Sequence, residues 1–159
     1  METFDRLLAD AGGASRTLTL PFERRRRSRQ RVVLDDGSEA QLLLPRGTVL
    51  RDGDVLGGAG IRRALVRAAA EEISVAASAD TALLLRAAYH LGNRHVPVQI
   101  GNGWLRYGHD HVLDELCRGL GLAVSVARLP FEPEAGAYAG GHAHSGAHPG
   151  AAAHDHHAH

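Results

Sequence analysis

Histidine is the residue type in this chain best suited to chemistry, because 11 of the 159 residues are histidine and seven of these lie between positions 142 and 159. Neutral imidazole is the commonest metal ligand among side chains and suits zinc, copper and nickel. Closely spaced imidazoles on a flexible chain can converge on one ion without a preformed pocket. We therefore predict metal binding by the C-terminal histidines: His142, His144, His148, His154, His156, His157 and His159.

Two of the earlier histidines lie around a predicted helix end. Gly92-Asn93 is a typical helix stop, so His95 would lie in the loop that follows, where its ring can be presented to a partner. His90 would lie in the last helical turn, where a histidine near the free carbonyl groups has a structural use. We therefore take His95, and not His90, as a candidate ligand.

His109 and His111 flank Asp110 just before a second predicted helix. In an extended segment, side chains at i and i+2 share a face and could hold one metal ion. On a helix the same two side chains would diverge by about 200°. Asp110 could simply cap the helix. The pair is thus a candidate metal site only if it lies in the loop.

Composition and motifs exclude several classes of protein. Eighteen basic residues, all arginine, balance 18 acidic ones, which argues against binding to nucleic acid or an anionic membrane through net positive charge. The basic run 24–27 lacks interleaved aromatic residues and is better explained as a solvated strand edge. The chain has no hydrolase or phosphate-loop motif, no lysine, no signal peptide and no apolar run of about 18 residues. We expect a cytoplasmic protein that is not an enzyme.

Short apolar runs separated by turn residues predict an all-β N-terminal domain over residues 17–71. The preceding residues 1–16 carry apolar side chains at helical spacing, and we predict a short helix or a frayed lead-in there. Residues 61–70 are ambiguous, because their alanine content favours a helix while their alternation favours a strand. We prefer the strand.

From residue 72 the pattern changes to β-α-β-β-α-β, with helices predicted over 81–91 and 110–120. This order is typical of a ferredoxin-like domain, which we place at 72–138. Cys117 falls on the apolar stripe of the second helix, where packing is its expected role. Residues 139–159 have almost nothing to bury, and we predict a disordered His-rich tail. The expected fold class is α+β.

Three segments resemble the signature of the UreE family of urease accessory metallochaperones: residues 89–100, 105–114 and 130–138. The resemblance extends over about residues 17–138 and is followed by the family's variable His-rich tail. It implies an N-terminal β domain of peptide-binding type and a homodimer formed through the second domain. It also implies Ni(II) binding and delivery to the urease apoprotein complex through the urease accessory GTPase, with His95 as the essential ligand and His109 and His111 as a secondary pair.

The resemblance and a shortage of ligands together predict that the main site holds one metal ion per two chains. Nickel usually takes four to six donors, and His95 has no other histidine at usable spacing. A two-fold axis beside His95 would bring two copies to one ion. Sequence leaves the metal open among Ni(II), Zn(II) and Cu(II), because copper outranks nickel at nearly any such site. The alternative function is general zinc, copper or nickel storage.

Overall fold

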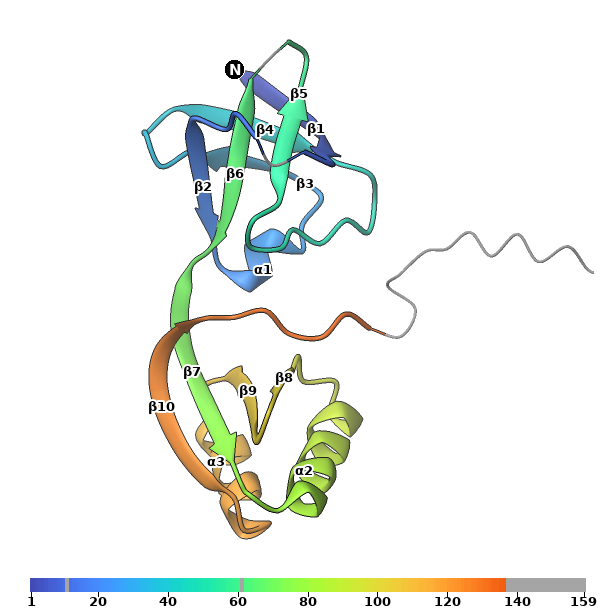
Figure 1. The fold of residues 1–159 in the computed structure, drawn as a ribbon, viewed down its shortest axis with the longest axis vertical. Coiled ribbons are helices and arrows are strands. Elements are labelled where there is room, and N and C mark those ends of the chain that lie inside the picture. Colours follow the sequence, from blue (N-terminus) through green and yellow to red (C-terminus); the bar gives the residue numbers. More distant parts are fainter. Residues whose placement is uncertain (11, 61, 137–159) are drawn as a thin grey trace, which may run out of the picture.

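The computed structural model describes residues 1–10, 12–60 and 62–136, which form two domains (Figure 1). The first is a barrel-like six-stranded sheet, and the second is a four-stranded sheet with two helices. The predicted disordered tail, residues 139–159, lies outside the described residues together with its seven histidines.

The first domain has the strand order β2-β6-β5-β1-β4-β3. Its alternating apolar residues point inward and form one core, whose members are Phe4, Leu18, Leu20, Val32, Leu34, Ala40, Leu42, Leu44, Leu50, Leu56, Ala64 and Val66. A single helical turn, α1 (Phe22–Arg25), follows β2. The strands are β1 (Glu2–Leu8), β2 (Arg16–Leu20), β3 (Arg29–Val33), β4 (Glu39–Leu43), β5 (Val55–Gly58) and β6 (Arg63–Ala68). The predicted all-β character of this region is confirmed.

The prediction of a helical or frayed lead-in over residues 1–16 is wrong. Residues Glu2–Leu8 form β1, an inner strand of the sheet that pairs with both β4 and β5. Phe4 is fully buried, whereas Leu7 is 41% exposed. The apolar side chains whose spacing suggested a helix therefore do not share one buried face. The partners of β1 lie more than 30 residues along the chain, and pairing with them overrides local preference.

The second domain contains β7 (Ala70–Ala77), α2 (Thr81–Asn93), β8 (Gln99–Gly101), β9 (Trp104–Gly108), α3 (His111–Gly119) and β10 (Ala123–Pro130). The predicted order β-α-β-β-α-β is confirmed. The sheet order is β10-β7-β9-β8 and each neighbouring pair is antiparallel, which is a split β-α-β connectivity. The strand preferred for residues 61–70 is also confirmed, since β6 runs to Ala68 and β7 begins at Ala70.

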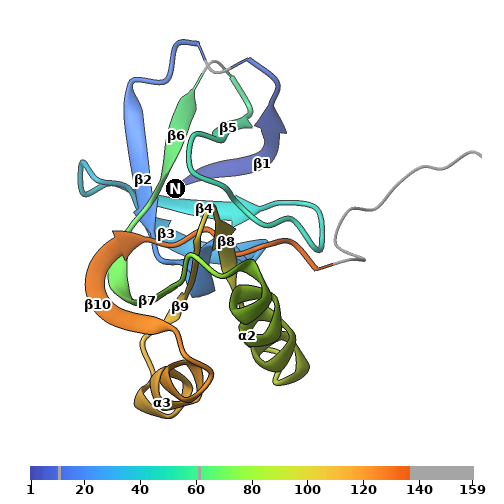
Figure 2. The same cartoon turned by 60° about the horizontal axis from the view of Figure 1, so that its bottom comes forward.

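Helices α2 and α3 pack against this sheet and against each other, below the six-stranded sheet in Figure 2. The predicted apolar stripes face the core, where Ala87, Leu91 and Cys117 are fully buried. Burial raises the pKa of the Cys117 thiol, in keeping with its predicted packing role. No helix of the described residues is long and apolar enough to cross a membrane.

The two domains meet through a small apolar cluster and a buried arginine. Phe22 of α1 packs edge-on against Phe131, with ring centroids 5.7 Å apart. Arg25 has no exposed surface and donates to the carbonyl oxygens of Leu20, Leu50 and Phe131. The expectation of a solvated edge for the basic run is therefore wrong at Arg25, because the helical turn of α1 directs this side chain into the domain junction.

Candidate metal centre

His95 lies two residues after the last residue of α2, at a position that normally belongs to glycine. Its N–H donates to the Gly92 carbonyl oxygen (3.0 Å), and the N–H of Val96 donates to the Leu91 carbonyl oxygen (3.1 Å). These two hydrogen bonds are those of a Schellman motif, in which the residue after the C-cap adopts a left-handed conformation. His95 has a φ of 58°, and no other non-glycine residue in the described part of the chain has a positive φ.

The sequence prediction placed this helix end too early. Gly92 and Asn93 are still helical, Arg94 is the C-cap, and His95 takes the left-handed position. A left-handed backbone costs an L-residue about 1–2 kcal/mol, which a glycine would avoid. A strained residue of this kind points to a functional constraint on its side chain. The predicted loop position of His95 is confirmed, and the strain is an additional signal that only the backbone reveals.

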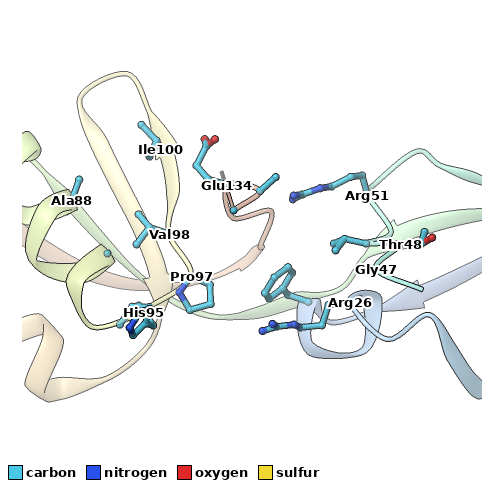
Figure 3. Close-up of a pocket in the computed structure, with 16 residues that line it drawn as sticks. Arg26, Gly47, Thr48, Arg51, Ala88, His95, Pro97, Val98, Ile100 and Glu134 are labelled. Atoms are coloured by element: carbon cyan, nitrogen blue, oxygen red, sulfur yellow. The ribbon is translucent and has the colours of Figure 1, made fainter. Parts of the chain in front are cut away.

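His95 lines a groove of about 840 Å³ between the two domains. Figure 3 shows His95 and Val98 on the wall from the second domain, with Arg26 and Arg51 on the opposite wall. The segment after β10 bridges the walls, because the N–H of Glu134 donates to the Val98 carbonyl oxygen (2.8 Å) while Arg51 donates to the carbonyl oxygen of Pro133 (2.7 Å). His95 is solvent-exposed at this groove and accessible to an incoming ligand.

The outer face of α2, the helix that precedes His95, carries two exposed large apolar side chains. Leu85 and Tyr89, four residues apart, are 66% and 68% exposed. His90 is exposed and its ring packs edge-on against Tyr89 at 5.3 Å, so it shares this surface without pointing into the core. Exposed large apolar side chains at helical spacing are typical of a contact surface.

His109 has very different surroundings at the junction of β9 and α3. Its side chain is 34% exposed, and its Nδ1 lies 3.0 Å from Ser74 Oγ and 3.2 Å from Asp114 Oδ2. Its Nε2 faces Glu72 Oε1 at 3.9 Å. The backbone holds this arrangement in place, because the His109 N–H donates to the Glu72 carbonyl oxygen (3.1 Å).

A buried hydrogen bond supports this arrangement from below. The Tyr107 hydroxyl donates to Asp114 Oδ1 at 2.8 Å, and both side chains are almost fully buried. Burial raises the pKa of Tyr107, so its hydroxyl keeps the proton that it donates. Although Ser74, His109 and Asp114 lie together, the hydroxyl and the carboxylate face the same ring nitrogen. A proton relay from serine through histidine to aspartate would need them on opposite nitrogens.

The predicted pair His109 and His111 is divided by the helix start. Asp110 is the N-cap of α3 and accepts from the N–H groups of Val112 and Leu113, which confirms its predicted capping role. His109 precedes the cap, while His111 is the first helical residue and is exposed. Within residues 1–10, 12–60 and 62–136, no group of three or more His, Cys, Asp or Glu side chains is arranged to hold a metal ion. Metal binding by this pair stays a prediction.

Sequence reasoning missed the side chains around His109. Glu72 and Ser74 reach it from β7 because β7 pairs with β9 in the register Ile73 to Gly108. Asp114 reaches it from the first turns of α3. The only sequence signal was the spacing of Asp114 from His109, which becomes meaningful once a helix is known to begin at His111.

Two family models match the chain. The N-terminal domain of the UreE urease accessory protein matches residues 5–69, and its C-terminal domain matches residues 71–159.

Proteins named urease accessory protein UreE are similar to most of the chain. That of Alkalilimnicola ehrlichii is 54% identical over 140 residues, covering 88% of this chain and 86% of the relative. That of Escherichia coli O157:H7 is 56% identical over 131 residues, covering 81% and 85%. That of Pseudomonas putida strain W619 is 58% identical over 123 residues, covering 77% and 76%. On these matches, with both domains covered, the chain belongs to the UreE family of urease accessory proteins.

Proposed function

We propose that this protein is a cytoplasmic metallochaperone that binds Ni(II) and delivers it to apo-urease through the urease accessory GTPase. Membership of the UreE family supports a role in urease maturation. The observation that carries the nickel proposal is His95, an exposed imidazole kept in a left-handed conformation at the edge of a groove. Neutral imidazole is a good nickel ligand, and strained backbone positions of this kind cluster at functional sites.

The proposed site is completed by a second copy of the chain. The exposed apolar face of α2, with Leu85 and Tyr89, supports a homodimer in which this face is buried. A two-fold axis beside the end of α2 would set two His95 rings against one ion. Water or tail histidines would fill the remaining positions. Such an open site suits transfer, because the ligands of a receiving protein can enter before the old ones leave.

The tail histidines, which lie outside the described residues, are proposed as a reservoir of weaker sites. Their composition predicts no packed core, so these ligands would have to be ordered on binding, and this entropy cost weakens each site relative to a preorganised one. Seven imidazoles between positions 142 and 159 also favour the second candidate function, general buffering of nickel, zinc or copper. Activation of apo-urease by the nickel-loaded protein and the GTPase separates delivery from buffering.

The test is a calorimetric nickel titration of the full-length chain in which the seven tail histidines are replaced by serine. We expect about 0.5 tightly bound nickel per chain, because two chains share one ion. His95→Ala should abolish this class and leave the protein folded and dimeric. His111→Ala, which removes an exposed imidazole at the start of α3 and not on the proposed dimer face, is the matched control and should leave this tight class unchanged. One tight nickel per chain that survives in His95→Ala would overturn the proposal.

A further inference from the structure

We propose that β10 (Ala123–Pro130) is a docking edge for a second copy of this chain, and that two β10 strands pair antiparallel about a two-fold axis at Ser125. The pairing would join two four-stranded sheets into one continuous sheet. The inference does not depend on the proposed function, because β10 carries none of the proposed metal ligands. It is carried by the exposure of the strand, the direction of its free backbone groups and the order of its side chains.

β10 is the longest outer strand of the two sheets and is almost entirely exposed. In the second sheet, with the order β10-β7-β9-β8, it has β7 on one side and no strand on the other. It pairs with β7 over eight residues in one unbroken register. Only two of these eight residues are partly buried, and Val126 is 45% exposed. A long edge with unpaired backbone groups is a template for another strand.

The backbone groups that point outward from β10 are those of Val124 and Val126. Along an antiparallel strand, the N–H and C=O of one residue point to the same side, and successive residues alternate. The Glu72 carbonyl oxygen faces β9, from which it accepts a hydrogen bond of 3.1 Å, so the next residue, Ile73, faces β10. Its partner Ala127 therefore faces β7, and the residues at even positions of β10 face outward. Within the described residues, no turn, loop or cap uses the outward groups of the two valines.

The residue order of β10 is the same in both directions around Ser125. The five residues centred on it are Ala-Val-Ser-Val-Ala. In antiparallel pairing about Ser125, Val124 meets Val126 of the second copy, and Ala123 meets Ala127 of the second copy. Because both valines direct their N–H and C=O outward, the two symmetric valine pairs can form four hydrogen bonds. Ser125 meets its own copy as a non-hydrogen-bonded pair, with Cα atoms about 4.5 Å apart.

The side chains match on both faces of the paired strands. Val124 packs against the core of the second domain, and Val126 lies on the same face at the exposed part of the strand. Pairing would cover Val126 with Val124 of the second copy and remove apolar surface from water. Arg128, the one charged residue of β10, would lie opposite Leu122 and not opposite its own copy. Like charges, which oppose strand pairing, therefore do not meet.

The other outer strands are protected from such pairing. On β3, Arg29 and Arg31 are exposed, and the Arg31 carbonyl oxygen accepts from Arg24 Nη2 at 2.9 Å. On β2, the Thr19 N–H donates to Asp35 Oδ1 at 3.1 Å. The remaining edge, β8, has only three residues. Charged side chains and short strands are common ways to block an edge, and the centre of β10 has neither.

β10 and α2 lie at opposite sides of the second domain (Figure 1). Helix α3 packs against β10, whereas α2 packs against β9. The edge pairing can therefore occur together with the proposed dimer contact through Leu85 and Tyr89 of α2. Interfaces formed by about five residues of each copy are much smaller than those of permanent dimers, so we expect reversible association at high protein concentration.

The test is disulfide cross-linking of the full-length chain in the presence of EDTA, which removes bridging metal ions. Ser125→Cys places two thiols opposite each other across the axis, at a Cα separation that a disulfide can span. Ala127→Cys, on the same face of the same strand, is the matched control, because its two copies would be more than about 13 Å apart. Under mild oxidation, Ser125→Cys should form covalent dimers at least about tenfold faster than Ala127→Cys. Cys117 is buried, and the wild-type chain provides the background rate.

Sedimentation of the chain without added cysteines is the second readout. The wild-type chain should associate further as its concentration rises. Val126→Lys should weaken this step by about tenfold or more, because a lysine on an edge opposes strand pairing. Val33→Lys, which changes an exposed valine on the edge strand β3, should alter it less than about twofold. Both positions are exposed, and circular dichroism checks that both variants fold.

Several results would overturn the inference. Equal cross-linking of Ser125→Cys and Ala127→Cys, or none in either variant, would exclude an axis at Ser125. A wild-type chain that does not associate further at high concentration, or an association that Val126→Lys leaves unchanged, would exclude β10 as the docking edge. If Val126→Lys does not fold, the two cysteine variants still decide. None of these outcomes affects the nickel titration at His95, which tests the proposed function separately.

Discussion

His95 and His109 lie in the same domain, yet their surroundings are built in opposite ways. His95 follows a helix, is exposed, and is held through its backbone in a left-handed conformation. His109 has a side chain that is 34% exposed and is held through that side chain, by Ser74 and Asp114. The first arrangement leaves the ring open for ligands from elsewhere, whereas the second fixes the ring before binding. An exchangeable main site and a preorganised subsidiary one are thus expected from one fold.

The largest expected effect comes from a substitution at the domain junction, which should disturb the groove beside His95 but not the contacts of His109. Arg25→Met removes a buried guanidinium together with its hydrogen bonds to the carbonyl oxygens of Leu20, Leu50 and Phe131 at the domain junction. We expect the free energy of unfolding, measured by chemical denaturation, to fall by about 3 kcal/mol or more. Amide hydrogen exchange should increase around the groove before it increases in α3.

Arg26→Met is the matched control for this junction. Arg26 is exposed and forms an exposed ion pair with Glu23 at 3.6 Å, and such pairs contribute about 0–1 kcal/mol. Equal losses for Arg25→Met and Arg26→Met would show that the buried position of Arg25 does not stabilise the junction.

The next largest effect is expected from a substitution in the buried hydrogen bond beside His109. Tyr107→Phe removes the hydroxyl that donates to Asp114 and leaves a buried carboxylate oxygen without this partner. We expect a loss of about 1–3 kcal/mol in the free energy of unfolding. Tyr89→Phe, at an exposed position on α2, should be neutral by comparison. A neutral Tyr107→Phe would mean that His109 is not held as rigidly as the contacts indicate.

A smaller effect tests the helix start that separates His109 from His111. Asp110→Ala removes the side chain that caps α3 and should cost about 1 kcal/mol, whereas Asp110→Asn should retain most of the cap. Urea denaturation of the two variants provides the measurement. Equal losses for alanine and asparagine would indicate that the charge of Asp110, not its capping hydrogen bonds, is what stabilises this helix.

The smallest expected effect is a difference in stability between two substitutions at His95. His95→Gly and His95→Ala both remove the imidazole, but only alanine retains the strain of the left-handed backbone. Relief of about 1–2 kcal/mol is offset by the greater freedom of glycine in the unfolded chain, about 0.4–1 kcal/mol. The glycine variant should therefore be more stable by about 0.5–1 kcal/mol in denaturant titrations. If alanine were the more stable, the position would not be strained.

The sequence predicted the second domain better than the first. Its helices carry their own signals, with a capping aspartate at Asp80 and at Asp110 and an apolar stripe that the structure buries. The strand β1 had no comparable signal, because its pairing with β4 and β5 depends on residues far along the chain. The burial of Arg25 was equally hidden within a run of arginines that looks solvated.

For the candidate site, the sequence by itself determined which residues can bind metal, because residue type fixes ligand chemistry and the helix end places His95 outside the core. Tertiary structure alone decided what surrounds them. The strain at His95 is a property of the backbone, and the groove beside it exists only where two domains meet. Glu72 comes to His109 from a strand more than 30 residues away through the register of β7 with β9. Such contacts are set by strand pairing, which local sequence does not encode.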